Sequence, residues 1–98
     1  MKNIIADINK AFESRVRLGI MSILMVQDEV DFNSMKEILN LTDGNLASHL
    51  KALEKIEYII MVKEFVGRKP RTSYSITKLG KHAFQEHLKA LEKLIKGE

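Results

Sequence analysis

The segment from Asp43 to Leu53 combines an apolar stripe with small, hydrogen-bonding side chains. Leu46, Leu50 and Leu53 recur at the spacing of one helix face, which predicts a short helix buried along that face. Amide, hydroxyl and imidazole groups beside a small side chain and a lysine lie opposite or on the flank, at Asn45, Ser48, His49, Ala52 and Lys55. Such side chains can bond to base edges and let a helix approach the major groove of a nucleic acid closely.

The densest positive charge of the chain lies in the run Gly67-Arg68-Lys69-Pro70-Arg71. Counting Lys and Arg against Asp and Glu, residues 1–40 and 41–62 each carry −1, residues 63–76 carry +3 and residues 77–98 carry +2. A polyanion is the expected partner of such a segment. The alternative is a solvated basic loop that has no partner.

Two short helices joined by a tight turn must position the first of these groups. Residues 33–39 predict an amphipathic helix, residues 40–42 the turn, and Thr42 the N-cap of the helix that follows. Together they predict a helix-turn-helix. The pair alone could equally be two core helices of any small helical protein, so the segments around it have to decide.

A β-hairpin must position the basic run. Residues 58–66 and 72–76 are rich in β-forming side chains, and residues 67–71, bounded by Gly67 and Pro70, predict a flexible turn between them. A helix-turn-helix followed by a hairpin with a basic tip is a winged helix. The fold predicted for the whole chain is therefore mainly α (α+β), one winged-helix domain over residues 1–98.

The remaining segments predict a helix over residues 3–12, a helix that follows Ser14 and ends near Gln27, and a very short strand at residues 30–32. A last helix, capped by Thr77, runs to about Lys96. Its length of about 20 residues, roughly 30 Å, exceeds what so small a body can cover. We therefore expect residues 1–13 and 77–98 to form a homodimer interface, although simple core packing is the alternative. The predicted interface residues are Ile4, Ile5, Ile8, Phe12, Phe84, Leu88, Leu91 and Ile95.

Several classes of protein are disfavoured. The chain has no cysteine, no glycine-rich phosphate loop and no nucleophile elbow, so we expect no enzyme and no cofactor. His82 and His87 are five residues apart and do not share a helix face, so no metal site is expected. No apolar run approaches the roughly 20 residues of a membrane span, and no signal peptide is recognisable, so a cytoplasmic location is expected.

At this point the chain resembles a known family, the small single-domain winged-helix transcriptional regulators related to the MarR and ArsR groups. The resemblance covers nearly the whole chain. It is carried by residues 17–24, by Phe32 with Met35, Ile38 and Leu39, by residues 41–53, by residues 67–72, and by residues 74–80, in which Thr77 is followed three residues later by Gly80.

The resemblance implies a homodimer that binds a pseudo-palindromic operator in double-stranded DNA and represses transcription. It implies that Thr42, Asn45, Ser48, His49 and Lys51 belong to the recognition helix and that Arg68, Lys69 and Arg71 belong to the wing. A small-molecule effector, if one exists, would bind at the dimer interface. The cysteine pairs of metal-sensing members are missing, so metal regulation is not expected.

Some roles stay open at this stage. His49 could contact DNA or could orient the recognition helix through a neighbouring helix. Arg17 could reach a phosphate or could pair with a carboxylate. Acidic residues of the recognition segment, Asp43, Glu54 and Glu57, are expected to offset its lysines. A winged helix used as a protein-interaction module in a larger assembly remains the alternative function.

Overall fold

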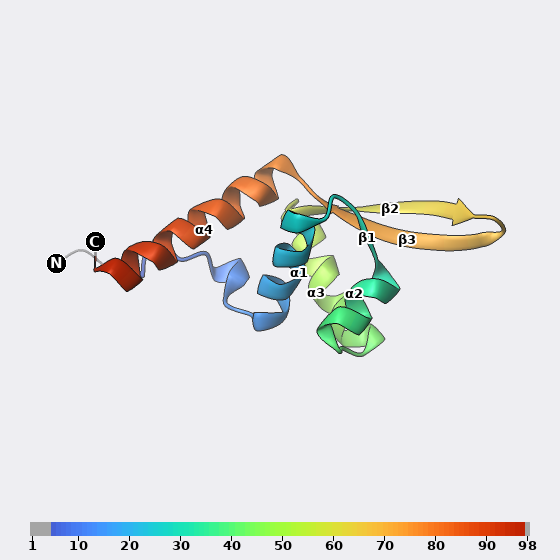
Figure 1. The fold of residues 1–98 in the computed structure, drawn as a ribbon, viewed down its shortest axis with the longest axis horizontal. Helices are drawn as coiled ribbons and strands as arrows, with labels where there is room; N and C mark the ends of the chain where they lie inside the picture. Colours follow the sequence, from blue (N-terminus) through green and yellow to red (C-terminus); the bar gives the residue numbers. More distant parts are fainter. Residues whose placement is uncertain (1–4, 98) are drawn as a thin grey trace.

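The protein, seen here as a computed structural model, is described over residues 5–97, and its elements follow the predicted order except near the N-terminus (Figure 1). In chain order they are a 3-10 turn η1 (Lys10–Phe12), α1 (Arg15–Val26), β1 (Val30–Asp31), α2 (Phe32–Leu39), α3 (Asp43–Lys55), β2 (Ile59–Val66), β3 (Lys69–Ile76) and α4 (Lys78–Lys96). This arrangement is the predicted winged helix.

Each α-helix begins after a hydroxyl or carboxylate side chain that accepts a hydrogen bond from a backbone N–H of the first turn. The capping residues, in chain order, are Ser14, Asp31, Thr42 and Thr77. Three of these caps confirm the helix starts predicted from the sequence. The fourth, Asp31, starts α2 at Phe32, one residue before the predicted start.

The predicted helix over residues 3–12 is wrong for the part that the structure describes. Residues 5–8 form turns and a bend, and only Lys10–Phe12 are helical, as a single 3-10 turn. An isolated helix of this length is marginal in water. The side chain of Asn9 accepts a hydrogen bond from Ala11 N–H, and the Asn9 backbone N–H donates to Nδ1 of His87 at 3.2 Å, so a continuous helix is interrupted here.

The three strands form one antiparallel sheet in the order β1-β3-β2. Strands β2 and β3 make a long hairpin, called the wing from here on, in which Val66 lies opposite Lys69. Only Gly67 and Arg68 remain in the turn. Gly67 has a positive φ of 68°, as a two-residue type II′ loop requires at its first position.

The predicted five-residue turn is therefore too long, because β3 begins at Lys69 rather than at Thr72. Pro70 can lie inside this strand because β1 pairs only with Ser73 and Tyr74. The other edge of β3 is open at Pro70, so the N–H that proline lacks is not needed by a neighbouring strand.

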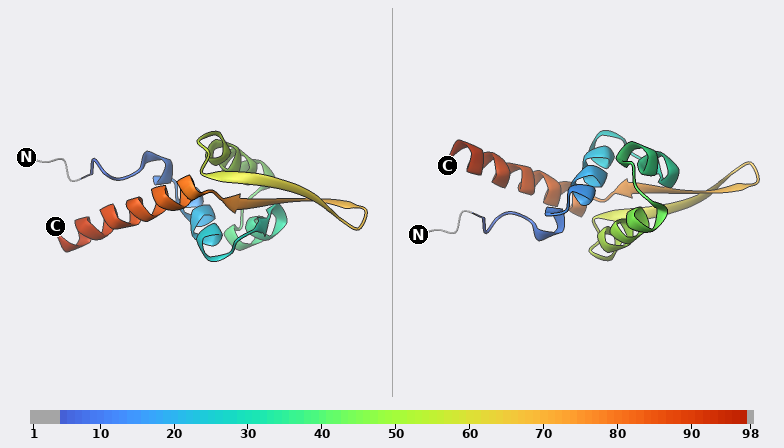
Figure 2. Two further views of the ribbon diagram at one scale, coloured as in Figure 1. Left: turned by 90° about the horizontal axis from the view of Figure 1, so that it is seen from above. Right: turned by 90° about the horizontal axis from the view of Figure 1, so that it is seen from below.

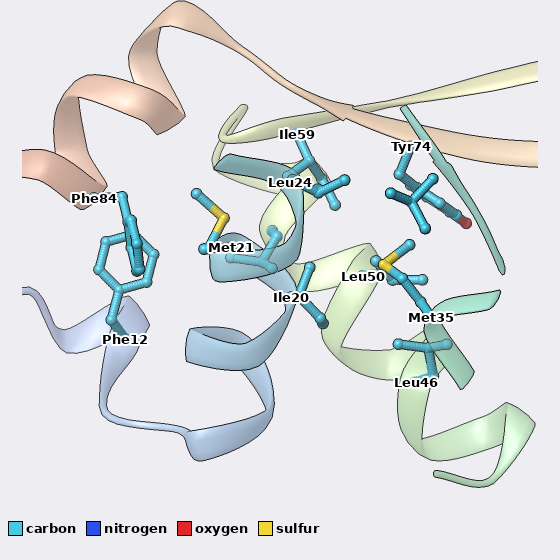
Figure 3. Packing of buried hydrophobic residues seen from close by; sticks show 12 residues of the cluster. Phe12, Ile20, Met21, Leu24, Met35, Leu46, Leu50, Ile59, Tyr74 and Phe84 are labelled. Carbon is cyan, nitrogen blue, oxygen red and sulfur yellow. The ribbon is translucent and has the colours of Figure 1, made fainter. Parts of the chain in front are cut away.

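Buried apolar side chains from all four α-helices, from η1 and from the sheet meet in one core (Figure 3). They are Phe12, Ile20, Met21, Leu24, Val30, Met35, Leu46, Leu50, Leu53, Ile59, Tyr74 and Phe84.

We call α1, α2, α3 and β1 the body. The wing and α4 project from the body in opposite directions, and the molecule measures 59 × 25 × 21 Å (Figures 1 and 2).

The two projections share one junction. The Thr77 N–H donates to the Tyr58 carbonyl at 3.0 Å, and the Thr77 hydroxyl donates to the Glu57 carbonyl at 2.6 Å. Gly80 passes so close that a Cβ there would overlap the Tyr58 carbonyl oxygen. The junction explains why Gly80 follows Thr77 in the sequence: the cap needs a hydroxyl, and the close contact needs a residue without a side chain.

Candidate nucleic-acid interface

Helix α3 buries one face in the core and turns the other to solvent. Leu46, Leu50 and Leu53 are fully buried. At 3.6 residues per turn, the face opposite to them consists of Gly44, Asn45, Ser48, Lys51, Ala52 and Lys55. All are exposed except Ala52, which is half-buried, and the surface is hollowed around Ser48 and Lys51. Thr42 lies exposed at the start of the same helix, so four of the predicted contact residues are gathered on one surface.

Acidic residues near α3 offset the lysines of this outward face in part. Asp43 forms an ion pair with Lys36 of α2 at 2.7 Å. Glu54 lines the same surface hollow as Lys51 and Lys55, as expected from the sequence, and its charge adds to burial in raising the pKa of Tyr74. Glu57 lies beyond the end of the helix. The outward face therefore carries two lysines with one carboxylate beside them.

His49 lies at the edge of α3 and contacts α1. Its Nδ1 accepts a hydrogen bond from Nε of Arg17 at 3.1 Å. Burial, and then the charge of Arg17, lower the pKa of His49, so the imidazole is neutral at neutral pH. Of the two roles left open, the structure shows the orienting contact. Arg17 donates to an imidazole rather than to a carboxylate, and its guanidinium retains further N–H groups that could reach a phosphate.

The wing holds the second group of predicted residues. Arg68 and Lys69 are exposed at its tip. Arg71 lies further back and pairs with Asp31 at 3.3 Å, between β3 and the start of α2. The hydrogen bond from Ser34, and to a smaller extent Arg71, lower the pKa of Asp31, so this carboxylate stays charged. Arg71 is thus partly neutralised within the chain, unlike the two residues at the tip.

Lys55 lies on the outward face of α3, where the helical spacing of the sequence predicts it. Sequence reasoning missed another cation, Lys63, which is exposed on β2 opposite Thr72. Lys63 could not be placed without the strand register, which decides the face on which it lies.

The predicted dimer residues divide into two groups. Phe12 and Phe84 are buried within the chain itself, where Phe12 packs against Phe84, Tyr58 and His87, so neither needs a second copy to cover it. Ile5, Leu88 and Ile95 are exposed, Ile8 and Leu91 are half-buried, and Ile4 lies outside the described residues. An exposed apolar stripe remains on α4, but it is shorter than the one predicted.

None of the helices within residues 5–97 is long and apolar enough to cross a membrane.

Residues 16–95 match the family described as "Winged helix DNA-binding domain". The uncharacterized protein MJ0432 of Methanocaldococcus jannaschii is 38% identical over 87 residues, which span 89% of this chain and 95% of that protein. The structure of a transcriptional regulator homologue from Pyrococcus horikoshii OT3 has a TM-score of 0.77 and 31% identity, covering 90% of this chain and 92% of that one. The resemblance to winged-helix transcriptional regulators is thereby confirmed.

More distant structures share the fold alone. Reduced AbfR bound to DNA has a TM-score of 0.72 and 16% identity, and the match covers 82% of this chain but 55% of that one. NadR in complex with 4-hydroxyphenylacetate has a TM-score of 0.74 and 18% identity, covering 96% of this chain and 64% of that one. The DNA and the 4-hydroxyphenylacetate in these two structures are ligands of AbfR and NadR.

Proposed function

Because the chain belongs to the winged-helix DNA-binding domain family, we propose that it is a homodimeric regulator of transcription that binds specific sites in double-stranded DNA. Helix α3 enters the major groove, and the wing contacts the flanking backbone or minor groove. Repression follows where such a site overlaps a promoter, because the bound dimer excludes other proteins from it.

One observation carries this proposal. The outward face of α3 presents an amide, a hydroxyl and two lysines around small residues, while Asp43 is paired with Lys36 and Glu54 lies beside the lysines. Small side chains allow the helix backbone to approach base edges, and the polar groups can bond to them. AbfR, which shares the fold, is recorded bound to DNA, and this supports the same partner for this chain.

The dimer is proposed on the basis of α4. Leu88 is 46% exposed and Ile95 is 86% exposed. They lie seven residues apart, which is close to two helical turns, so they share one face. Pairing two copies about a two-fold axis would cover this stripe in both and would place two recognition helices on one side of a duplex.

Selection of duplexes from a random pool by the purified chain tests the proposal. We expect an inverted repeat whose half-sites lie about one DNA turn apart, roughly 34 Å, or a multiple of it. Replacing Asn45 or Ser48 with alanine should then reduce discrimination for that site by about 1–3 kcal/mol per lost base contact, with little change in binding to random DNA. Failure to enrich any sequence would contradict the proposal, and parallel losses on both DNAs would reassign the two residues to the backbone.

The protein-interaction module remains the competing function. Such a module would use an apolar face for docking, whereas the outward face of α3 is largely polar. Binding of a partner protein in the absence of any affinity for duplex DNA would favour it.

A further inference from the structure

The tip of the wing exposes an aromatic side chain that the basic character of the hairpin does not require. Phe65 is 75% exposed, although it is one of only four phenylalanines in the chain. The ring contacts found within residues 5–97 join Phe12, Tyr58, Phe84 and His87 and do not include Phe65. A large apolar group left in solvent among cations points to an interaction surface.

The strand register decides where this ring lies. Phe65 pairs with Pro70, so the two side chains lie next to each other on one face of the wing. The pair of Met61 and Tyr74 belongs to the same face, four residues nearer the body. The pair of Val66 and Lys69 lies on the opposite face, because side chains alternate along a strand.

This face is the one turned toward the recognition helix. Tyr74 points into the core beside Leu50 of α3 and Met35 of α2 (Figure 3). A hollow of about 450 Å³ lies between the first turn of α2 and this side of the wing, lined in part by Pro70 and Thr72. A duplex lying against α3 would therefore meet the face that carries Phe65.

The wing is long enough to reach the next groove. Five residues separate Met61 from Val66, and at about 3.3 Å per residue they extend the hairpin by about 17 Å beyond the body. This distance is half of a DNA turn of about 34 Å, which separates a major groove from the minor groove beside it.

From this geometry, and on the premise of the proposed function, we propose that Phe65, backed by Pro70, inserts between base pairs from the minor groove and kinks the duplex there. Apolar wedges of this kind, phenylalanine and proline among them, unstack a base step while nearby cations hold the phosphates. Lys63 on the same face and Arg68 at the tip are placed for those phosphates. Pyrimidine–purine steps unstack most readily, so the insertion adds a sequence preference outside the bases that α3 reads.

Fluorescence of 2-aminopurine tests the insertion. The probe is the duplex selected by the wild-type chain, with 2-aminopurine placed in turn at each step flanking the α3 half-site and with donor and acceptor dyes at its ends. We expect the wild-type chain to raise the fluorescence at one flanking step and to shorten the end-to-end distance. Phe65→Ala should abolish both signals, whereas Phe65→Leu, which keeps an apolar wedge, should retain most of them.

Affinity gives an independent readout. Phe65→Ala should weaken binding about fivefold to tenfold. This loss is at the low end of the range for base–aromatic stacking, because the cost of unstacking a base step offsets part of the free energy gained by stacking on the ring. The salt dependence of binding should not change, since no phosphate contact is lost. Val66→Ala, an equally simple truncation on the other face of the wing, is the control and should keep the wild-type affinity and both fluorescence signals.

The outcomes separate the insertion from the proposed function. Wild-type binding without any change in fluorescence or end-to-end distance would overturn the insertion and leave the regulator intact. Absence of binding to every duplex would overturn both. Equal signals from Phe65→Ala and the wild type, or a loss of self-association in Phe65→Ala by sedimentation, would assign the ring to another role and overturn the insertion.

Discussion

The wing and α4 both project from the body, and they differ in which of their cations form ion pairs. On α4, Lys89 pairs with Glu86 at 3.3 Å and Lys96 pairs with Glu92 at 2.6 Å. On the wing, Arg71 is paired, whereas none of the ion pairs within the described residues 5–97 involves Arg68 or Lys69. Both projections expose apolar side chains. On α4 the lysines next to Leu88 and Ile95, Lys89 and Lys96, are each paired, although the ion pairs within residues 5–97 do not include Lys78, Lys81 or Lys93. At the tip of the wing, by contrast, neither of the two neighbouring cations is paired.

This difference in ion pairing indicates which partner each projection can bind. Unbalanced positive charge repels a second copy of itself and attracts a polyanion. An apolar stripe whose neighbouring charges are balanced locally can meet its own copy without repulsion, and burial then supplies the stabilisation. We therefore assign the wing to DNA and α4 to the dimer, and the experiments below try to break that division.

The largest effect is expected at the junction that both projections share. In Gly80→Ala, the new Cβ would overlap the Tyr58 carbonyl oxygen, which is backbone and cannot move aside independently. We expect a loss of about 4 kcal/mol or more in the free energy of unfolding, as for other severe backbone clashes. Denaturant unfolding followed by circular dichroism measures it.

Gly44→Ala is the matched control, since a Cβ at Gly44 has nothing within 4 Å. It should be neutral or stabilising by up to about 1 kcal/mol, because alanine favours a helix more than glycine does. Equal stability of the two variants would show that the junction tolerates a side chain.

The next largest effect separates α4 from the wing. Leu88→Glu places a charge in the proposed dimer stripe of both copies. Each copy would lose about 1.5 kcal/mol of burial, or about 3 kcal/mol for the dimer, which is more than a hundredfold in the dissociation constant. Sedimentation equilibrium measures the dimer, and circular dichroism of the monomer should be unchanged because this side chain is already half-exposed.

Glu86→Gln, a change on the side of α4 opposite to Leu88 that removes the ion pair with Lys89, should leave the dimer intact within about 0.5 kcal/mol. A wild-type chain that is monomeric at tens of micromolar would contradict the division itself.

A smaller effect is expected from the charges of the wing. Replacing Arg68 and Lys69 with alanine should lower the slope of log affinity against log salt by about two units, one for each phosphate contact. Arg71→Ala should lower it by less, because Asp31 already balances Arg71. Titration of duplex DNA at several salt concentrations compares the variants, and identical slopes for all of them would remove the wing from the interface.

The smallest effect is expected from pH. Burial lowers the pKa of His87, as burial and then Arg17 lower that of His49, so the folded protein binds protons less readily than the unfolded chain. The stability that the neutral rings contribute is fully present above about pH 6.5 and is lost as the pH falls through the unfolded value toward the folded ones.

Urea unfolding at pH 7.5 and at pH 5.5 should therefore give a lower midpoint at the acidic pH. His87→Gln should reduce that difference, because Nδ1 of His87 accepts the Asn9 N–H only when it is unprotonated. His82→Gln, a change of an exposed histidine on the same helix, controls for the substitution itself. A difference that is the same in both variants would show that other groups control the acid response.

Periodicity and capping residues were enough to predict the helices of the body. Leu46, Leu50 and Leu53 predict the buried face of α3, and Thr42 and Thr77 predict where two helices begin, because these signals act within one or two turns. The same local signals placed the outward residues of α3 correctly on one face.

Features that depend on long-range contacts escaped prediction. The N-terminal segment has helical spacing, yet Asn9 donates to His87, 78 residues away, and the segment stays irregular. Arg71 looks like a free wing cation until β1 brings Asp31 beside it, and the role of His49 stays open until Arg17 approaches it from α1. In each case the deciding partner lies far away in the sequence and is specified by packing.

The junction at Thr77 and Gly80 fixes the start of α4 against the base of the wing. A change in the length of α4 would therefore move its far end relative to the wing. In the proposed dimer, a one-residue insertion between Gly80 and Leu88 would turn the apolar stripe by about 100° around the helix axis while the wing kept its place. The two wings would then point to different sides of the duplex. An insertion of seven residues, close to two full turns, would restore the phase but move each wing outward by about 10 Å. In the proposed dimer, the length of α4 would therefore set the distance between the two DNA half-sites.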